Sequence, residues 1–212
     1  MHALKLTARP RGGTALSLTV GCPVEAVLRP VATRGDQLDP NDVHLLTEWR
    51  NRFVQSFLTE FTADDERTAR WLTDVVGPDD TRILFMLDGA RDGQTIGYIG
   101  LAFIDWEQGA AEADAIVRGG EAPRGLMKRS LLTLLRWAHE QLGLRTLGVR
   151  VRSDNPAVEF YRRMGFAAVR RVPLRRIEQP EMIQWTEDES LPPGEPSLVH
   201  MRLPAAILEG QF

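Results

Sequence analysis

Apolar side chains recur along the chain at two spacings, which predict alternating strands and helices. Patterns rich in β-branched and aromatic residues predict strands over residues 27–31, 83–87, 95–104, 111–117, 146–152, 167–174 and 197–203. Helical spacing between capping and stop signals predicts helices over residues 40–49, 62–72, 127–142 and 156–164. This order predicts an α+β fold with a mixed, mostly antiparallel central sheet flanked by helices.

The stretch 154–166 carries the clearest local signals. Asn155 can cap a helix through its side-chain oxygen, and Pro156 then takes the first helical position, where a missing N–H costs nothing. Gly165 supplies the left-handed residue that ends the helix about nine residues later. The apolar stripe consists of Ala157, Phe160, Tyr161 and Met164. A helix this short depends on packing, so Tyr161 is expected on or beside a packed surface.

A glycine turn precedes the long helix predicted at 127–142. The helix has an apolar stripe of Met127, Leu131, Leu134, Leu135, Ala138 and Leu142, and Gly143 ends it. The turn at Gly125 leads into first-turn amides that have no intrahelical acceptor, which makes this end of the helix suitable for a pyrophosphate. Arg124, Lys128 and Arg129 add positive charge there.

Composition narrows the class of protein. The chain has 212 residues and 43% hydrophobic content, which fits one large domain with a sizeable core. A net charge of −3 gives no bulk attraction to nucleic acid or to an anionic membrane, and no apolar run approaches the roughly 20 residues of a membrane span. The single cysteine, Cys22, forms no internal disulfide and completes no metal cluster, so a reducing, cytoplasmic location and no metal are expected.

The two ends of the chain and one charged segment lie outside the regular pattern. Residues 1–24 read as a hairpin extension that covers a sheet edge, contributes to a homodimer contact or has no fixed contact. Residues 25–206 are expected to form the domain and residues 207–212 a tail. Residues 175–196 are too polar for a core and long for a loop, so an active-site flap is expected there.

The run Asp154-Asn155-Pro156-Ala157-x-x-x-Tyr161-x-x-x-Gly165-Phe166 resembles the last conserved block of the GNAT acyl-CoA-dependent N-acetyltransferases. The resemblance extends over residues 25–206. It implies the GNAT fold, with acetyl-CoA as acyl donor. It also implies that Asn155 and Ala157 lie near the pantetheine arm, and that Tyr161 gives a proton to the departing thiolate.

The glycine turn matches the family only in part. GNAT proteins usually present Gln or Arg, two variable residues, Gly, one variable residue, then Gly or Ala. This chain has Ala122, Gly125 and Met127 at those places, so only Gly125 matches. Met127 is expected to put bulk where the backbone approaches the diphosphate. The residues that the resemblance assigns to CoA around this turn are Val117, Arg124, Gly125, Leu126, Met127 and Lys128.

The acceptor side carries a weaker resemblance. The Leu28-Arg29-Pro30 strand, followed by a helix that ends in Trp49-Arg50-Asn51, resembles GNAT members that acetylate amines on nucleotide sugars. These include the pseudaminic-acid pathway type, and the ribosomal-protein-acetyltransferase-like branch is also similar. The resemblance implies acceptor contacts from Trp49, Arg50, Asn51 and Phe57, with Glu60 and Phe61 as further lining. The alternative is that Trp49 is a core residue and Arg50 an ion-pair partner.

The function implied is transfer of an acetyl or short acyl group from CoA to a primary amine of a small molecule, such as an amino sugar or a nucleotide sugar. The amine must lose a proton, and Glu112 and Asp114 are the candidate bases because strand alternation places both on one face with Ile116. A solvated charged face is the alternative for both.

A protein N-terminal acetyltransferase and a non-catalytic acyl-CoA-binding module also remain open. The incomplete glycine turn favours the module, and Tyr161 argues against it.

Overall fold

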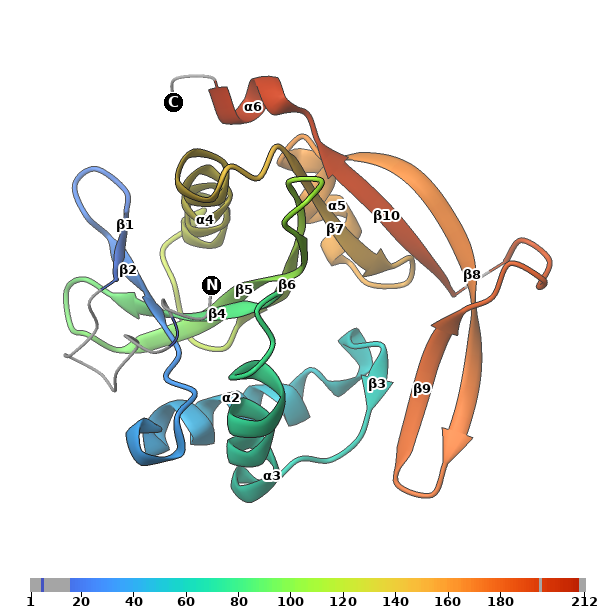
Figure 1. Cartoon of the computed structure of the whole chain (residues 1–212), viewed down its shortest axis with the longest axis horizontal. Helices are drawn as coiled ribbons and strands as arrows, with labels where there is room; N and C mark the ends of the chain where they lie inside the picture. The colour runs from blue at the N-terminus through green and yellow to red at the C-terminus, as the bar shows by residue number, and fades with distance from the viewer. Residues whose placement is uncertain (1–4, 6–15, 195, 210–212) are drawn as a thin grey trace.

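The computed structural model describes Lys5, residues 16–194 and residues 196–209 of the 212-residue chain. The described strands form a ten-stranded sheet in the order β1-β2-β4-β5-β6-β7-β10-β8-β9-β3 (Figure 1). Their bounds are β1 Leu18–Val20, β2 Ala26–Pro30, β3 Thr59–Glu60, β4 Ile83–Gly89, β5 Thr95–Asp105, β6 Ala110–Arg118, β7 Thr146–Arg152, β8 Ala167–Gln179, β9 Met182–Glu187 and β10 Ser197–Leu203. Within these strands only β6 and β7 pair in parallel, so the predicted mixed, mostly antiparallel sheet is confirmed.

Helices cover the two faces of the sheet and define two hydrophobic cores. The first core lies under α4 (Leu126–Leu142) and α5 (Ala157–Arg163), with the C-terminal α6 (Ala205–Glu209) beside them. The second core lies on the other face, under α2 (Pro40–Arg52), α3 (Asp65–Arg70) and the π-helical turns that follow α3 (Trp71–Val76). The site described below lies where the strands between these two layers separate (Figure 1).

Most predicted helices form where their signals lie. Asp39 caps α2 by accepting a hydrogen bond from the Asn41 amide at 2.9 Å, and Gly143 ends α4 in the left-handed conformation. The cap predicted at Thr62 is wrong, because α3 begins after Asp64. The Asp64 carboxylate accepts a hydrogen bond from the Arg67 amide at 2.7 Å.

The strict alternation predicted for residues 111–117 is wrong at Ala115. Ala113 packs in the first core, whereas Ala115 and Val117 pack on the second. The backbone at Ala115 has a φ of 53°, and the pairing register with β5 shifts beside it. A β-bulge of this kind turns the following side chains to the other face of the sheet.

The segment predicted to be an active-site flap contains a regular β-hairpin. β8 continues past Leu174 to Gln179, and β9 returns alongside it and pairs with β3. Near the N-terminus, β1 pairs with β2 at the sheet edge. The other predicted half of that hairpin lies outside the described residues, except for Lys5.

A buried ion cluster fixes α2 against the sheet. The guanidinium of Arg29 on β2 donates to both carboxylate oxygens of Asp42 at 2.7 and 3.0 Å and to Asp88 of β4 at 2.9 Å. Arg29 and Asp42 are 4% and 2% exposed. Because α2 carries residues predicted for the acceptor side, this cluster also positions the site.

Candidate active site

The adjacent strands β6 and β7 separate part-way along their length. Their last pair is Ala113↔Val149, and no later pair joins them within the described sheet. Beyond it, β6 continues beside β5 to Arg118 and β7 continues beside β10 to Arg152. The strands therefore open into a V whose two edges no longer pair with each other. Val117 lies on the β6 arm with its side chain in the second core, so it offers only backbone to the V.

Asp114 and Tyr161 come from the two sides of this V. Asp114 follows the last β6–β7 pair and precedes the left-handed Ala115. Tyr161 of α5 is 6% exposed and packs edge-on against Phe160 and Phe166, with ring centroids 5.3 and 5.7 Å away. Burial, and then the negative charge of Asp114, raise the pKa of the Tyr161 phenol. The phenol is therefore protonated at neutral pH and lies within electrostatic reach of a carboxylate.

Tyr98 of β5 is a second buried phenol near Asp114. Its ring stacks on that of Trp49, with centroids 6.1 Å apart and planes 8° apart. Burial raises the pKa of Tyr98, the positive charge of Arg50 opposes this shift, and Asp114 adds to it. Asp114 thus acts on two phenols that come from opposite cores, Tyr98 and Tyr161.

Glu112, the other candidate base, is held in an ion pair. Its Oε2 lies 2.5 Å from Nε of Arg150, whose guanidinium lies 4.1 Å from the ring centroid of the exposed Phe103. By contrast, none of the described cationic side chains forms an ion pair with Asp114. Of the two candidate bases, Asp114 is therefore the one whose carboxylate is not paired with a described cation.

The turn between β7 and α5 has the predicted cap. Oδ1 of Asn155 accepts a hydrogen bond from the Ala157 amide at 2.8 Å, and Pro156 has helical backbone angles. Gly165, just past the helix, has a φ of 96°. Asn155 and Ala157 are both partly exposed, so they are accessible to a ligand beside the turn.

The N-terminus of α4 is open to an anion. Gly125 precedes the helix with a φ of 81°, and none of the described side chains caps the first turn. Leu126 is buried, and Met127 packs its side chain against the first core, so its bulk points inward. The expected obstruction of a diphosphate by Met127 stays a prediction. The side chains of Arg124 and Lys128 are exposed at the same end.

Arg129 adds a further cation beside this turn. Its Nη2 donates to the Glu25 carboxylate at 2.7 Å, and both terminal nitrogens lie 3.4 Å from the Arg124 carbonyl oxygen. Nε of Arg129 is buried without a partner among the described residues. The segment before β2, which contains Glu25, thus borders the same helix end.

The end of α2 supports the loop that follows β6. Trp49 is buried, and a Cβ added at Gly119 would lie 1.8 Å from its Cε2, so only glycine fits above the indole. Arg52 donates to the Gly119 carbonyl at 2.6 Å. Asn51 exchanges two hydrogen bonds with the backbone of Ala63, at 2.9 and 2.8 Å. The contacts give Trp49 a core position and use the Asn51 amide to brace the loop before α3.

Arg50 lies between aromatic rings on the same side. Its guanidinium carbon lies 4.1 Å from the centroid of Phe57 and 4.4 Å from that of Phe61, and Arg67 stacks on Phe61 at 3.9 Å. Nη2 of Arg50 donates to Thr59 Oγ1 at 3.0 Å, whereas Nη1 is buried without a partner among the described residues. Burial lowers the pKa of Arg50. The structure brings Arg50 and Phe57 together, as two predicted acceptor residues.

Residues 53–60, which we call the bridge, run from the end of β6 to the end of β7. At the start of the bridge, α2 contacts Gly119, directly after β6. At its end, Glu60 accepts a hydrogen bond at 3.0 Å from Arg152, the last residue of β7. β9 pairs with the β3 part of the bridge. The bridge therefore spans the open end of the V (Figure 1).

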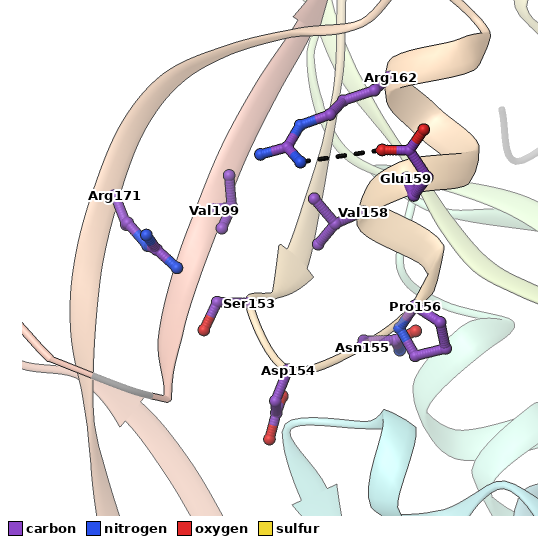
Figure 2. Close-up of a pocket in the computed structure, with 9 residues that line it drawn as sticks. All are labelled: Ser153, Asp154, Asn155, Pro156, Val158, Glu159, Arg162, Arg171 and Val199. Carbon is purple, nitrogen blue, oxygen red and sulfur yellow. Dashed lines mark ion pairs between the residues drawn. The ribbon is translucent and has the colours of Figure 1, made fainter.

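A groove of about 470 Å³ lies on another side of α5. Figure 2 shows it between α5 and the strands β10 and β8, with Asn155 and Pro156 at one end. Its lining comprises Ser153, Asp154, Asn155, Pro156, Val158, Glu159, Arg162, Arg171 and Val199. The charges of its two arginines and two acids balance each other. Neither Asp114 nor Tyr161 lines this groove, and we take those two residues as the candidate centre.

Comparison with protein families decides the assignment. Residues 33–167 match the family model described as the acetyltransferase (GNAT) domain. The chain belongs to the GNAT acetyltransferase family. It is therefore an acyl-CoA-dependent N-acetyltransferase, and its candidate site lies where this chain separates β6 from β7.

Solved structures agree with the GNAT fold. A protein described as apo FdhC, a nucleotide-linked sugar GNAT, has a TM-score of 0.66 and 14% identity, with 92% of this chain and 93% of that chain covered. Spermidine N-acetyltransferase from Vibrio cholerae, in complex with CoA and spermine, has a TM-score of 0.66 and 16% identity, with 88% and 99% covered. At these identities the likeness shows the fold alone. No curated protein sequence matched the chain.

Two structural features are absent from the described residues. None of their helices is long and apolar enough to cross a membrane. They also hold no group of three or more His, Cys, Asp or Glu side chains placed to bind a metal ion.

Sequence reasoning missed several residues of this site. Tyr98 and Arg152 carry no motif, and Trp185 lies in the segment that was expected to be a flap. Their roles depend on contacts between distant segments, such as the bond between Arg152 and Glu60 across 92 positions. The Gly119-Gly120 pair directly after a predicted strand was the one usable signal, since paired glycines often mark a close backbone approach.

Proposed function

We propose that this GNAT protein transfers an acetyl or short acyl group from CoA to the primary amine of a small molecule, such as an amino sugar or a nucleotide sugar. The observation that carries the proposal is that Asp114, directly after the last β6–β7 pair, adds to burial in raising the pKa of the buried Tyr161 phenol. An amine of pKa near 10 must lose a proton, and a thiolate of pKa near 8.5 gains one. The site offers a carboxylate for the first task and a phenol for the second.

The two residues act in sequence. Acetyl-CoA supplies the acetyl group as a thioester. Asp114 takes the proton of the acceptor ammonium, directly or through a water, and frees the nitrogen to attack. Tyr161 gives its phenolic proton to the departing sulfur and regains a proton from solvent. The C–N bond forms and the C–S bond breaks without a covalent enzyme intermediate.

The residues around the V fit the donor. The open first turn of α4, with left-handed Gly125 before it and Arg124 and Lys128 beside it, suits a diphosphate. The two strand edges of the V suit the amide groups of a pantetheine arm, in the way an extended chain adds to a sheet. Asn155 and Ala157 border that arm at the start of α5.

The acceptor side favours a small molecule that carries an anionic group. The bridge spans the open end of the V, which leaves less room for a protein chain than for a small amine. Arg50 and Arg67 put two positive charges on Phe61, and Nη1 of Arg50 has no partner among the described residues. These charges favour the phosphate of a nucleotide sugar over a polycation such as spermidine.

A substrate panel with detection of the released CoA thiol tests the proposal. The panel contains a nucleotide-linked amino sugar, its free amino sugar, spermidine and a peptide with a free N-terminus. We expect turnover of the nucleotide-linked amino sugar at a higher kcat/KM than spermidine, and none of the peptide. Turnover of the peptide alone would favour the protein N-terminal acetyltransferase. Tight CoA binding without thiol release from any amine would favour the binding module.

A further inference from the structure

One nearly buried arginine joins the two halves of this site. Arg152, at the end of β7, is 8% exposed. Its Nε and Nη2 donate to the two carboxylate oxygens of Asp154 at 3.0 and 2.7 Å, and its Nη1 donates to Glu60 of the bridge at 3.0 Å. Its guanidinium also lies 4.5 Å from the ring centroid of Trp185 on β9.

Trp185 of β9 makes two hydrogen bonds to the bridge. Nε1 of Trp185 donates to the same Glu60 oxygen at 2.6 Å, and the Trp185 amide donates to the Leu58 carbonyl at 2.7 Å. The bridge, β9 and the β7–α5 turn therefore meet at Arg152. Hydrogen bonding to Asp154 raises the pKa of Arg152, and the same bond lowers that of Asp154, so the network keeps its charges at neutral pH.

We propose that Arg152 is a positioning residue that couples the CoA side of the site to the acceptor side. The inference rests on the proposed function, which puts CoA beside Asn155. Asp154 directly precedes Asn155. A ligand that orders the β7–α5 turn therefore also orders the Asp154 carboxylate, which accepts hydrogen bonds from Arg152. The guanidinium is planar and rigid, and it transmits that position to Glu60. Glu60 is the last residue of the bridge. The bridge also contains Phe57, whose ring stacks against the guanidinium of Arg50.

The coupling makes a prediction that needs no acceptor. CoA bound at the turn orders the bridge, although the bridge belongs to the other side of the V. Hydrogen exchange of backbone amides reports such ordering segment by segment. We expect CoA to slow exchange in residues 53–60 of the wild-type protein about fivefold or more, the lower end of common coupling between sites.

The experiment compares exchange with and without saturating CoA in the wild type and in Arg152→Gln. In the variant, CoA is expected to slow exchange at residues 124–129 as before and to leave residues 53–60 within about twofold of the free protein. Arg175→Gln is the matched control, because it removes an Arg–Asp ion pair with Asp188 on the β8–β9 hairpin. It should respond to CoA like the wild type.

Glu60→Leu is the second variant, since it removes the oxygen that accepts from Arg152 and Trp185 and leaves the Arg152–Asp154 pair in place. It should lose the response of the bridge while residues 154–160 still respond to CoA. This gives a test even where Arg152→Gln does not fold.

The outcomes separate the inference from the function beneath it. Slower exchange at residues 124–129 without any change in the bridge of the wild type would overturn the coupling alone. A bridge response that persists in Arg152→Gln and Glu60→Leu would also overturn it. No response to CoA at residues 124–129 in the wild type would overturn the proposed function and the inference together.

Discussion

The carboxylate of Asp114 on β6 adds to burial in raising the pKa of the Tyr161 phenol on α5. Asp114 lies on β6 just past its last pair with β7, and Tyr161 lies on α5, the helix that follows β7, so the separation of β6 and β7 leaves room between a candidate base and a candidate acid. A direct attack by an amine on a thioester needs such a pair, because one proton is lost and another is gained at different atoms.

The raised pKa values of two buried tyrosines predict a loss of stability at high pH. Burial is the main cause for both Tyr98 and Tyr161. The unfolded chain releases each proton near pH 10 and the folded chain only above that, so stability is complete below pH 10. Above it, each tyrosine should lower the free energy of unfolding by about 1.4 kcal/mol per pH unit. Urea unfolding at pH 9, 10 and 11 measures the slope.

Tyr161→Phe should reduce the slope of the free energy of unfolding against pH by the contribution of one tyrosine. The contribution of Tyr98 should remain. An unchanged slope in the variant would show that Tyr161 is not shielded from solvent in the folded protein.

Replacing the free carboxylate predicts a pH-dependent loss of activity. Asp114→Asn should lower kcat/KM by about 100-fold near neutral pH and much less near pH 10, where free amine is abundant. Glu112→Gln is the comparison, since Glu112 is already paired with Arg150. Initial rates from pH 6 to pH 10 decide between them. The assignment is reversed where Glu112→Gln shows the pH-dependent loss and Asp114→Asn does not.

CoA should stabilise the protein through the first turn of α4. At 100 times its dissociation constant, a ligand adds about 2.7 kcal/mol, which for a chain of this size raises the Tm by roughly 5 to 10 °C. Gly125→Ala should reduce the shift, because the left-handed backbone is strained and the new Cβ would lie 2.9 Å from Arg129 Nη1.

Gly143→Ala is the matched control for this shift. Gly143 has a φ of 70° at the other end of α4, with no atom within 4 Å of an added Cβ. It should lower the Tm of the free protein by a similar strain and keep the full CoA shift. Equal shifts in the two variants would move the diphosphate away from Gly125.

The buried cluster at Arg29 predicts an asymmetric cost. Arg29→Met leaves Asp42 buried without its partner and should cost about 3 to 5 kcal/mol, whereas Arg29→Met with Asp42→Leu should recover most of that loss. Urea denaturation measures both. If Arg29→Met lowers the free energy of unfolding less than Arg29→Met with Asp42→Leu does, this pair does not hold α2 against the sheet.

The sequence predicted most elements because their signals are local. Asn155, Pro156 and Gly165 set the limits of α5, and Gly143 ends α4, as predicted. The bulge at Ala115 had no signal, because alanine rarely adopts a left-handed backbone and nothing in its side chain announces it. The strands within residues 175–196 were not predicted because β8 is exposed beyond Leu174 and β9 is partly buried almost throughout, so neither stretch has the alternation that marks a half-buried strand.

The candidate site was predictable only in part for the same reason. Gly125 and Tyr161 belong to motifs, and the negative charge of Asp114 adds to burial in raising the pKa of Tyr161. The bridge and its bond to Arg152 arise from contacts across 92 positions, which no local pattern encodes. Trp49 and Asn51 contact the loops at Gly119 and Ala63, which no local pattern indicated, and their role at the acceptor stays a prediction.

Single-turnover transfer by Tyr161→Phe tests the central claim most directly. The change deletes one oxygen and keeps the ring that packs on Phe160 and Phe166. Folding and the CoA-induced rise in Tm should therefore persist. The acetyl transfer step, measured with enzyme in excess over acetyl-CoA and the best amine of the panel, should slow by roughly 100- to 10,000-fold. A folded variant with a rate within a few-fold of wild type would contradict the role of Tyr161 as the acid.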